Sequence, residues 1–249
     1  MIAEIFADKV SLGKAAAACG AAYIRRAIAA RGSANIIVAT AASQFELQDA
    51  LLVEKEIDWS QVRIFHLDEY IGLPADHPAS FRKNLRARLI DKLPCPPAAF
   101  YPVDGNAADL GKVIADLAQA LHTFPTDVAF IGIGENGHIA FNDPPADFET
   151  EEAFLKIQLD EACRRQQLGE GWFASLDAVP RTALSMSVRQ IMKSAAIINT
   201  VPDLRKAQAV KNALEGPLSK LCPASILNTH PNCYTFLDQD SASLLKNKP

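Results

Sequence analysis

Two adjacent carboxylates, Asp68 and Glu69, stand directly behind a short apolar run and could do acid–base chemistry. The run covers residues 62–67 and is rich in β-branched and aromatic residues, as is typical of a strand buried in a parallel sheet. A glycine- and proline-containing turn at residues 72–78 would hold the pair on a stiff loop. Because the carboxyl ends of strands form the ligand-binding edge of an open α/β sheet, this placement favours an active site. A helix cap or a solvated turn is the alternative.

An imidazole follows a second apolar run in the same manner. Residues 128–131 predict a strand, a glycine-rich turn with Gly134 and Gly137 comes next, and His138 and Asp143 close the segment. Glycines allow a small ligand to approach main-chain N–H groups closely. A histidine in such a loop is more typical of a functional group than one on the apolar face of a helix. The two strand ends therefore predict one site that combines a carboxylate with an imidazole.

The glycine spacing at residues 132–137 formally matches the dinucleotide-binding fingerprint. That motif must open a helix, whereas the β-prone residues 139–141 and the prolines at 144 and 145 leave no room for one. His66, His77 and His138, with the nearby aspartates, lack a specific metal-ligand spacing. We therefore expect no nucleotide cofactor, no other cofactor and no metal.

Composition narrows the class of protein. A chain of 249 residues suits one well-buried α/β domain, and a net charge of −4 gives no general attraction for nucleic acid. The five cysteines include no Cys-x-x-Cys pair, which argues against a disulfide framework or a thiolate zinc site. No signal sequence and no apolar run of membrane-spanning length is present. We expect a cytoplasmic protein without a membrane or nucleic-acid partner.

Segments with helical and strand-like periodicity alternate along the chain. Helices are expected at residues 11–31, from 43 onward, and at 80–91, 106–123 and 203–215, with Ser11, Ser43 and Ser80 as caps. Strands are expected at residues 35–40, 63–68, 127–132, 195–201 and 233–238. This alternation predicts a single α/β domain with a doubly wound, mostly parallel, Rossmann-like sheet and helices on both faces. Residues 144–180 are the least regular and are the expected lid.

Three segments together resemble the glucosamine-6-phosphate deaminase (isomerase) family. They are HLDEYIGLPADHPASF at residues 66–81, GIGENGHIAFNDP at 132–144, and PDLRKAQAVKNALEGP at 202–217 followed by PASILNTHPN. The resemblance extends to about residue 238, so it covers nearly the whole chain. The related 6-phosphogluconolactonases share the fold and the glycine-histidine loop. They typically carry an arginine after the acidic pair and a different turn, so they are the weaker match.

The resemblance implies roles for the catalytic groups. His138, steered by Asp143 and Asn136, would open the sugar ring, and Asp68 would then move a proton between C2 and C1. Glu69 would support Asp68 or its loop. Two positions depart from the family's pattern, since Asn136 stands where well-known deaminases carry an aspartate and Asp143 where they carry a glutamate. An amide adds no charge, so we expect it to raise the basicity of His138 less than an aspartate would.

The resemblance also implies a phosphate site. Its members would be Lys206, an arginine of the lid, for which Arg164 and Arg165 are candidates, and the loop formed by Thr40, Ala41, Ala42 and Ser43. Both alanines replace family glycines, so we expect the loop to take a different path or the substrate to sit differently. Alternatively, Ser43 caps its own helix and Lys206 is a surface residue.

The sequence as a whole predicts an enzyme that isomerises and deaminates an amino-sugar phosphate, similar to glucosamine-6-phosphate, to a ketose phosphate and ammonia. Two alternatives stay open. One is a lactonase for phosphorylated sugar lactones, which would use His138 as a base for water and have no need of Asp68 at C2. The other is a non-catalytic sugar-phosphate sensor. The expected partner is a small sugar phosphate, and homo-oligomerisation is left open.

Overall fold

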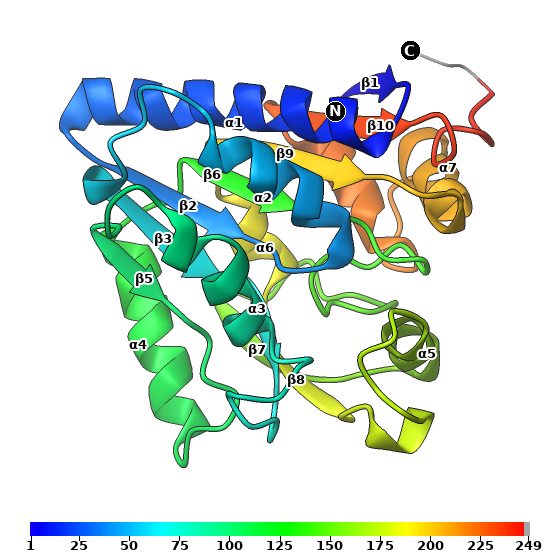
Figure 1. The fold of residues 1–249 in the computed structure, drawn as a ribbon. Coiled ribbons are helices and arrows are strands. Elements are labelled where there is room, and N and C mark those ends of the chain that lie inside the picture. Colours follow the sequence, from blue (N-terminus) through cyan, green and yellow to red (C-terminus); the bar gives the residue numbers. More distant parts are fainter. Residues whose placement is uncertain (247–249) are drawn as a thin grey trace.

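A seven-stranded parallel sheet runs through the centre of the computed structural model, which describes residues 1–246 (Figure 1). In spatial order its strands are β1 (Ile2–Phe6), β10 (Cys233–Asp238), β9 (Ala196–Val201), β6 (Val128–Ile131), β2 (Ala34–Val38), β3 (Val62–His66) and β5 (Ala99–Tyr101). Every neighbouring pair is parallel. The central strands β2 and β6 are buried along their whole length, as expected for a sheet covered on both faces. The predicted fold class is confirmed.

Helices cover both faces of this sheet. Ile36 and Val38 point to one face, where they pack against α1 (Lys9–Arg31), α2 (Phe45–Leu52) and α3 (Phe81–Arg88). Ile37 points to the other face, which is covered by α4 (Leu110–Thr123), α6 (Val188–Met192) and α7 (Ala207–Glu215). This alternation follows from the two-residue period of a strand. Gly20 lets α1 approach the sheet closely, since a β-carbon there would lie 2.2 Å from the Phe130 ring.

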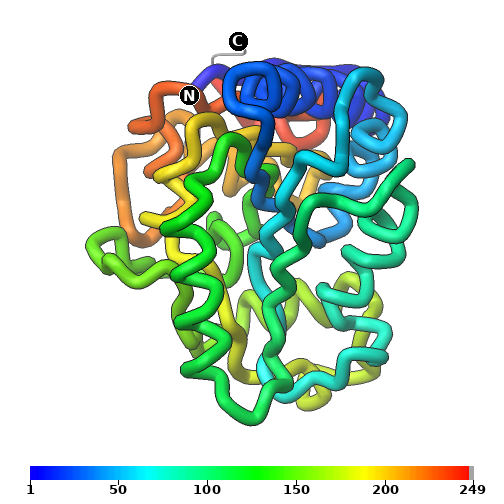
Figure 2. The backbone as a smooth tube through the Cα atoms, turned by 90° about the vertical axis from the view of Figure 1, so that its left-hand side faces the viewer, coloured from blue at the N-terminus to red at the C-terminus, as the bar shows by residue number. Residues whose placement is uncertain are grey.

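A smaller antiparallel sheet lies beside the main one. Its order is β4 (Asp68–Tyr70), β8 (Thr182–Met186) and β7 (Phe154–Gln158). Together with α5 (Glu161–Gly169) it encloses a separate apolar cluster that includes Tyr70, Phe81, Phe141 and Phe173. In both ribbon and tube views this part lies at the lower end of the molecule, away from α1 (Figures 1 and 2).

The structure corrects several local predictions. Asp8, not Ser11, is the N-cap of α1, because its carboxylate accepts the Ser11 N–H and Ser11 completes a capping box. Ser43 does not cap α2, whose amino terminus has no side-chain cap. The predicted cap at Ser80 is confirmed, since its hydroxyl accepts the Lys83 N–H. Residues 144–180, hereafter the lid segment, contain the regular elements β7 and α5.

Candidate active site

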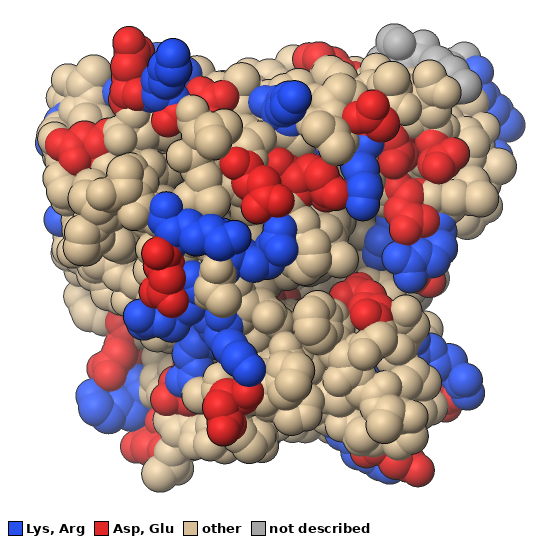
Figure 3. All heavy atoms as spheres, in the orientation of Figure 1, with Lys and Arg blue, Asp and Glu red and all other residues tan. Residues whose placement is uncertain are grey.

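A cavity of about 690 Å³ lies at the carboxyl ends of the parallel strands. After β2 the chain adds β3 and β5 toward one edge of the sheet, and it then continues with β6 on the other side of β2. The topological switch point therefore lies between β2 and β6. Thr40, which follows β2, and Gly132, which follows β6, both line the cavity. Figure 3 shows the molecule hollowed between its upper and lower parts, with acidic and basic side chains on the rim. The fold thus places the predicted site where α/β proteins bind ligands.

Asp68 reaches the cavity wall from the junction of β3 and β4. Only 6% of the residue is exposed, and its carboxyl group makes no hydrogen bond within residues 1–246. Burial, followed by the repulsion of Glu69, raises the pKa of Asp68 to about 8. A carboxyl group that titrates near neutral pH can both take up and release a proton, as acid–base catalysis requires.

Glu69 does not line the cavity, and the role expected for it from the sequence was support of Asp68 or its loop. Its carboxylate accepts the backbone N–H groups of Phe81 and Arg82 at 3.1 and 2.8 Å, and the Ser80 hydroxyl at 2.9 Å. Burial raises the pKa of Glu69, although these hydrogen bonds oppose the shift. Glu69 therefore fixes the amino terminus of α3 against β4, which supports the loop behind Asp68.

A tight turn brings His138 into the lining of the same cavity. Gly134 N–H donates to the His138 carbonyl at 2.9 Å, and Gly137 takes a φ of 86°. The imidazole lies over Gly134, where a β-carbon would come within 2.2 Å of the Nε2 atom. Both glycines are thus required by geometry, Gly137 for its positive φ and Gly134 for the close approach of the ring. No helix follows the turn, since Ile139 and Asn142 form an isolated bridge, so the glycines do not build a dinucleotide site.

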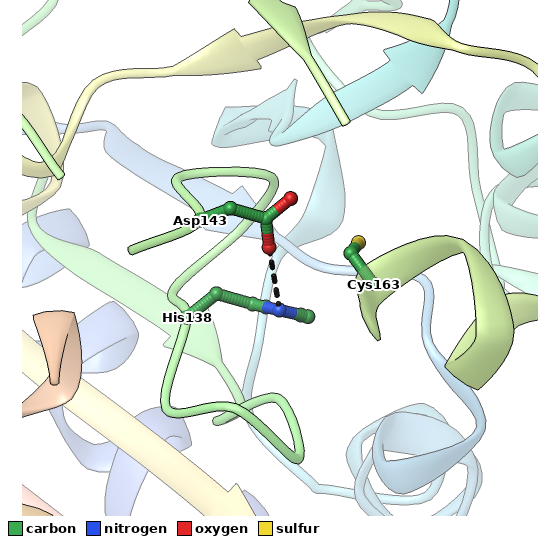
Figure 4. A group of neighbouring side chains, drawn as sticks. All are labelled: His138, Asp143 and Cys163. Atoms are coloured by element: carbon green, nitrogen blue, oxygen red, sulfur yellow. Dashed lines mark ion pairs between the residues drawn. The ribbon is translucent and has the colours of Figure 1, made fainter. Parts of the chain in front are cut away.

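Asp143 is the direct partner of the imidazole. Its Oδ1 atom lies 3.1 Å from Nδ1 of His138, an ion-pair distance, although the ring N–H is not well aligned with that oxygen (Figure 4). Burial would raise the pKa of Asp143, but the contacts from His138 and Asn136 hold it below its usual value. With Nδ1 turned to Asp143, the Nε2 atom is the one that faces Gly134 and the cavity.

Asn136 acts on the histidine only indirectly. Its amide group donates to Asp143 at 3.1 Å and more weakly to Asp160 at 3.4 Å, while its oxygen accepts the His138 backbone N–H. Within residues 1–246 the Asn136 side chain makes no hydrogen bond to the imidazole nitrogens. It can affect His138 through the position of Asp143, which lies beside the ring.

The loop formed by Thr40, Ala41, Ala42 and Ser43 lines the cavity as predicted. Ala41 has a φ of −59°, and Ala42 begins a short 3₁₀ helix, so neither alanine needs the left-handed conformation that glycine would tolerate. The alanines are therefore compatible with a loop that leads directly into α2. Backbone N–H groups at the start of a helix are suited to an anion.

Lys206 is buried in the cavity wall, with 7% of the residue exposed. Burial lowers its pKa, while Glu135 and Glu170 oppose that shift from a distance. The neighbouring Arg205 pairs with Asp203 at 3.0 Å and lies 3.7 Å from Glu135, whereas the ammonium group of Lys206 has no ion pair within residues 1–246. A buried cation without a partner needs a negative ligand.

The lid segment contributes other side chains to the cavity than the sequence predicted. Arg164 does not reach the cavity, because its guanidinium donates to the carbonyls of Val179 and Leu176 within the lid segment. Gln166, Gln167 and Glu170 line the cavity instead. Nothing in the sequence marked these residues, since their approach depends on how α5 folds back over the strand ends. Arg165 is exposed and pairs with Glu161.

The remaining histidines of the sequence analysis lie outside the cavity lining. His66 is fully buried, its Nε2 atom lies 3.2 Å from the Thr40 hydroxyl, and burial lowers its pKa to about 3. His77 accepts the Ala79 N–H in the turn behind β4. The structure therefore separates both from His138.

The fold and the cavity define an α/β protein that binds its ligand at the carboxyl edge of a parallel sheet. The chain belongs to the family described as glucosamine-6-phosphate isomerases/6-phosphogluconolactonase, whose model matches residues 7–235. Glucosamine-6-phosphate deaminase of Lactobacillus delbrueckii subsp. bulgaricus is 36% identical over 217 residues, covering 86% of this chain and 89% of that protein. Glucosamine-6-phosphate deaminase of Bacillus cytotoxicus is 33% identical over 228 residues, covering 92% and 84%. The family resemblance is confirmed.

Solved structures agree with this assignment. A monomeric glucosamine-6-phosphate deaminase superposes with a TM-score of 0.90 at 28% identity, covering 98% of this chain and 100% of that one. A 6-phosphogluconolactonase from Shewanella baltica OS155 superposes with a TM-score of 0.77 at 20% identity, covering 96% and 97%, a likeness that concerns the fold alone. No helix within residues 1–246 combines the length and apolar character needed to span a membrane.

Proposed function

We propose that the chain catalyses the isomerisation and deamination of an amino-sugar phosphate of the glucosamine-6-phosphate type, giving a ketose phosphate and ammonia. The observation that carries this proposal is the convergence of Asp68, His138 and Lys206 on one cavity. The deaminase relatives above, which are more than 30% identical over most of the chain, support the same activity.

The groups in the cavity can divide the reaction between them. His138 moves a proton between the ring oxygen and O1, which opens the ring, and Asp143 holds the imidazole in position. Asp68 removes the proton from C2, which gives an enolamine, and returns it to C1. Water then adds to the resulting imine at C2 and ammonia leaves, so the net reaction consumes one water molecule and falls in the hydrolase class.

Phosphate binding would come from Lys206 and from the N–H groups of residues 41–43. This binding fixes the sugar between Asp68 and His138, so that both proton transfers occur within one bound geometry. Closure of the lid segment would bring Gln166 and Gln167 over the sugar and keep out bulk water.

The charges of the cavity favour an amino sugar over a lactone. Carboxylates outnumber cationic side chains in its wall, which is lined by Asp8, Glu46, Glu170, Asp203, Asp238 and Asp240 and by Lys9, Arg205 and Lys206. A protonated amino group offsets part of the charge of a sugar phosphate, whereas a phosphorylated lactone lacks this compensation. An acidic wall therefore selects for the ammonium-bearing substrate.

The test is a coupled assay of ammonia release across hexosamine 6-phosphates, run in parallel with lactone hydrolysis. We expect ammonia and ketose phosphate in equal amounts from at least one hexosamine phosphate. Lactone hydrolysis without ammonia release would establish the lactonase alternative, and binding without turnover would establish a sensor.

Asp68→Asn provides the internal control for this assay. Because the amide cannot accept the C2 proton, kcat should fall by about 10²–10⁴-fold with substrate binding retained. Asp76→Asn, in the exposed turn behind β4, should leave kcat unchanged. More than about a tenth of wild-type kcat in the Asp68 variant would remove Asp68 as the base.

A further inference from the structure

A cysteine of the segment 144–180 completes a cluster with His138 and Asp143. Ligand atoms of His138, Asp143 and Cys163 all lie within 4.8 Å of one another (Figure 4). Cys163 comes from the first turn of α5, whereas His138 and Asp143 flank the bridge that follows the glycine turn. The three side chains thus converge from two separate segments.

The cluster has an open ligand position on the histidine. His138 is 7% exposed, and its Nδ1 atom has no well-aligned hydrogen-bond partner within residues 1–246, although Asp143 lies 3.1 Å away. A buried ring nitrogen in this state can coordinate a cation without losing a strong hydrogen bond.

The surroundings of the thiol favour positive charge. Cys163 is 1% exposed, and the carboxylate of Asp143 lies within 4.8 Å of its sulfur. A carboxylate this close to a thiol stabilises a divalent cation bound between them, and metal coordination deprotonates the thiol outright.

The combination of one thiolate, one imidazole and one carboxylate fits a borderline-soft divalent metal such as Zn²⁺ better than Mg²⁺ or Ca²⁺. Tetrahedral zinc places its ligand atoms about 3.3–3.7 Å apart, so the cluster needs to contract by roughly 1 Å. Three protein ligands with water in the fourth position form a complete zinc site.

We propose that His138, Asp143 and Cys163 form an inhibitory site for zinc-like divalent metal ions. Binding replaces the thiol proton, which is released to solvent, by a sulfur–metal bond. The metal occupies Nδ1 of His138, so Nε2 carries the remaining ring proton and cannot accept another from the sugar. This consequence for turnover rests on the proposed role of His138, whereas the metal site itself rests on the cluster alone.

Co²⁺ titration of the full chain tests the site without reference to activity. We expect one equivalent to bind, with a sulfur-to-cobalt charge-transfer absorption, and Zn²⁺ to displace it. Cys163→Ser should lose that absorption and bind at least about ten-fold more weakly. Cys95→Ser, which changes a free cysteine behind α3, should retain both.

Activity measurements then distinguish metal binding at the cluster from its effect on turnover. Zn²⁺ should inhibit the wild type and Cys95→Ser reversibly, with recovery on adding EDTA, and should inhibit Cys163→Ser at least about ten-fold less effectively. Absence of the charge-transfer absorption in the wild type, or its persistence in Cys163→Ser, would overturn the site. A cobalt signal without inhibition would leave the metal site intact and contradict the role of His138 in turnover.

Discussion

At the scale of single residues, the cavity contains two buried ionisable groups without partners of opposite charge. Burial raises the pKa of Asp68 and lowers the pKa of Lys206, so each shift opposes the charged form. Such groups reduce stability in the free protein, and they are typical of sites whose ligand supplies the missing partner. A phosphate would serve Lys206, and the amino-bearing C2 of the sugar would serve Asp68.

Lys206→Met should separate ligand binding from stability. We expect KM for the phosphorylated sugar to rise by about 10–100-fold, as for the loss of a charged hydrogen bond worth about 1.5–3 kcal/mol. The melting temperature should stay equal or rise, because the substitution removes an unpaired buried charge. Steady-state kinetics and thermal unfolding measure the two effects.

Lys211→Met is the matched control, since Lys211 lies on helix α7, which begins directly after Lys206, but does not line the cavity. It should change neither KM nor the melting temperature appreciably. An unchanged KM together with a lower melting temperature in Lys206→Met would instead make Lys206 a structural residue.

At the scale of elements, helix α5 and its N-cap Asp160 are hydrogen-bonded to the segment 135–143. The Asp160 N–H donates to Asp143, and the Glu135 N–H donates to Gln166. A further hydrogen bond, from the Tyr70 hydroxyl to Gln167, joins the helix to β4. The segment 144–180 therefore contributes side chains to the cavity lining and also holds Asp143, the ion-pair partner of His138. Opening of α5 would release part of this support.

Gln166→Ala should loosen this connection. Loss of one hydrogen bond worth about 1 kcal/mol corresponds to a change of about five-fold in kcat/KM. The Glu135 amide should exchange with solvent faster, because it donates to the Gln166 side chain in the structure. Hydrogen-exchange mass spectrometry on peptides covering residues 132–143 measures this directly.

Arg165→Ala controls for the change of helix sequence, since Arg165 is exposed and pairs with Glu161 on the same helix. This variant should leave hydrogen exchange in residues 132–143 unaltered. Equal exchange in Gln166→Ala and wild type would mean that α5 and the turn are not coupled through this contact.

At the scale of the whole molecule, the sequence predicted what depends on local pattern. The apolar runs that form β2, β3 and β6 predicted a parallel sheet, and β10 was predicted at its observed bounds. The antiparallel sheet escaped prediction because β4 is three residues long and pairs with β8, more than 100 residues along the chain. Strand β4 also carries both carboxylates, so its polar sequence resembled a loop.

Among the residues of the site, those that follow a strand could be predicted and those on helix α5 could not. Residues that follow a buried strand, such as Asp68 and His138, could be placed at the sheet edge from the sequence. Residues of the lid segment could not, because one helical residue corresponds to a rotation of about 100°. Arg164 therefore points toward Val179, whereas Gln166, two positions and about 200° further around the helix, lines the cavity.

The raised pKa of Asp68 has a consequence for the stability of the entire fold. An unfolded chain releases this proton at a pH near 3.8, whereas the folded protein retains it up to about pH 8. Between these values the native state binds more protons than the unfolded state, so the contribution of Asp68 to stability falls as the pH rises. Below this window the group is protonated in both states and contributes no dependence on pH.

Asp68→Asn should therefore be more stable than the wild type, by an amount that grows from about pH 4 to about pH 8 and reaches the order of a few kcal/mol. The amide occupies the same space but does not ionise, so the variant escapes the cost of charging a buried carboxyl group. Denaturant unfolding across this range measures the difference, with the exposed Asp76→Asn as control. A difference that stays constant with pH would mean that Asp68 titrates near its ordinary value, and its assignment as a proton carrier at neutral pH would lose its physical basis.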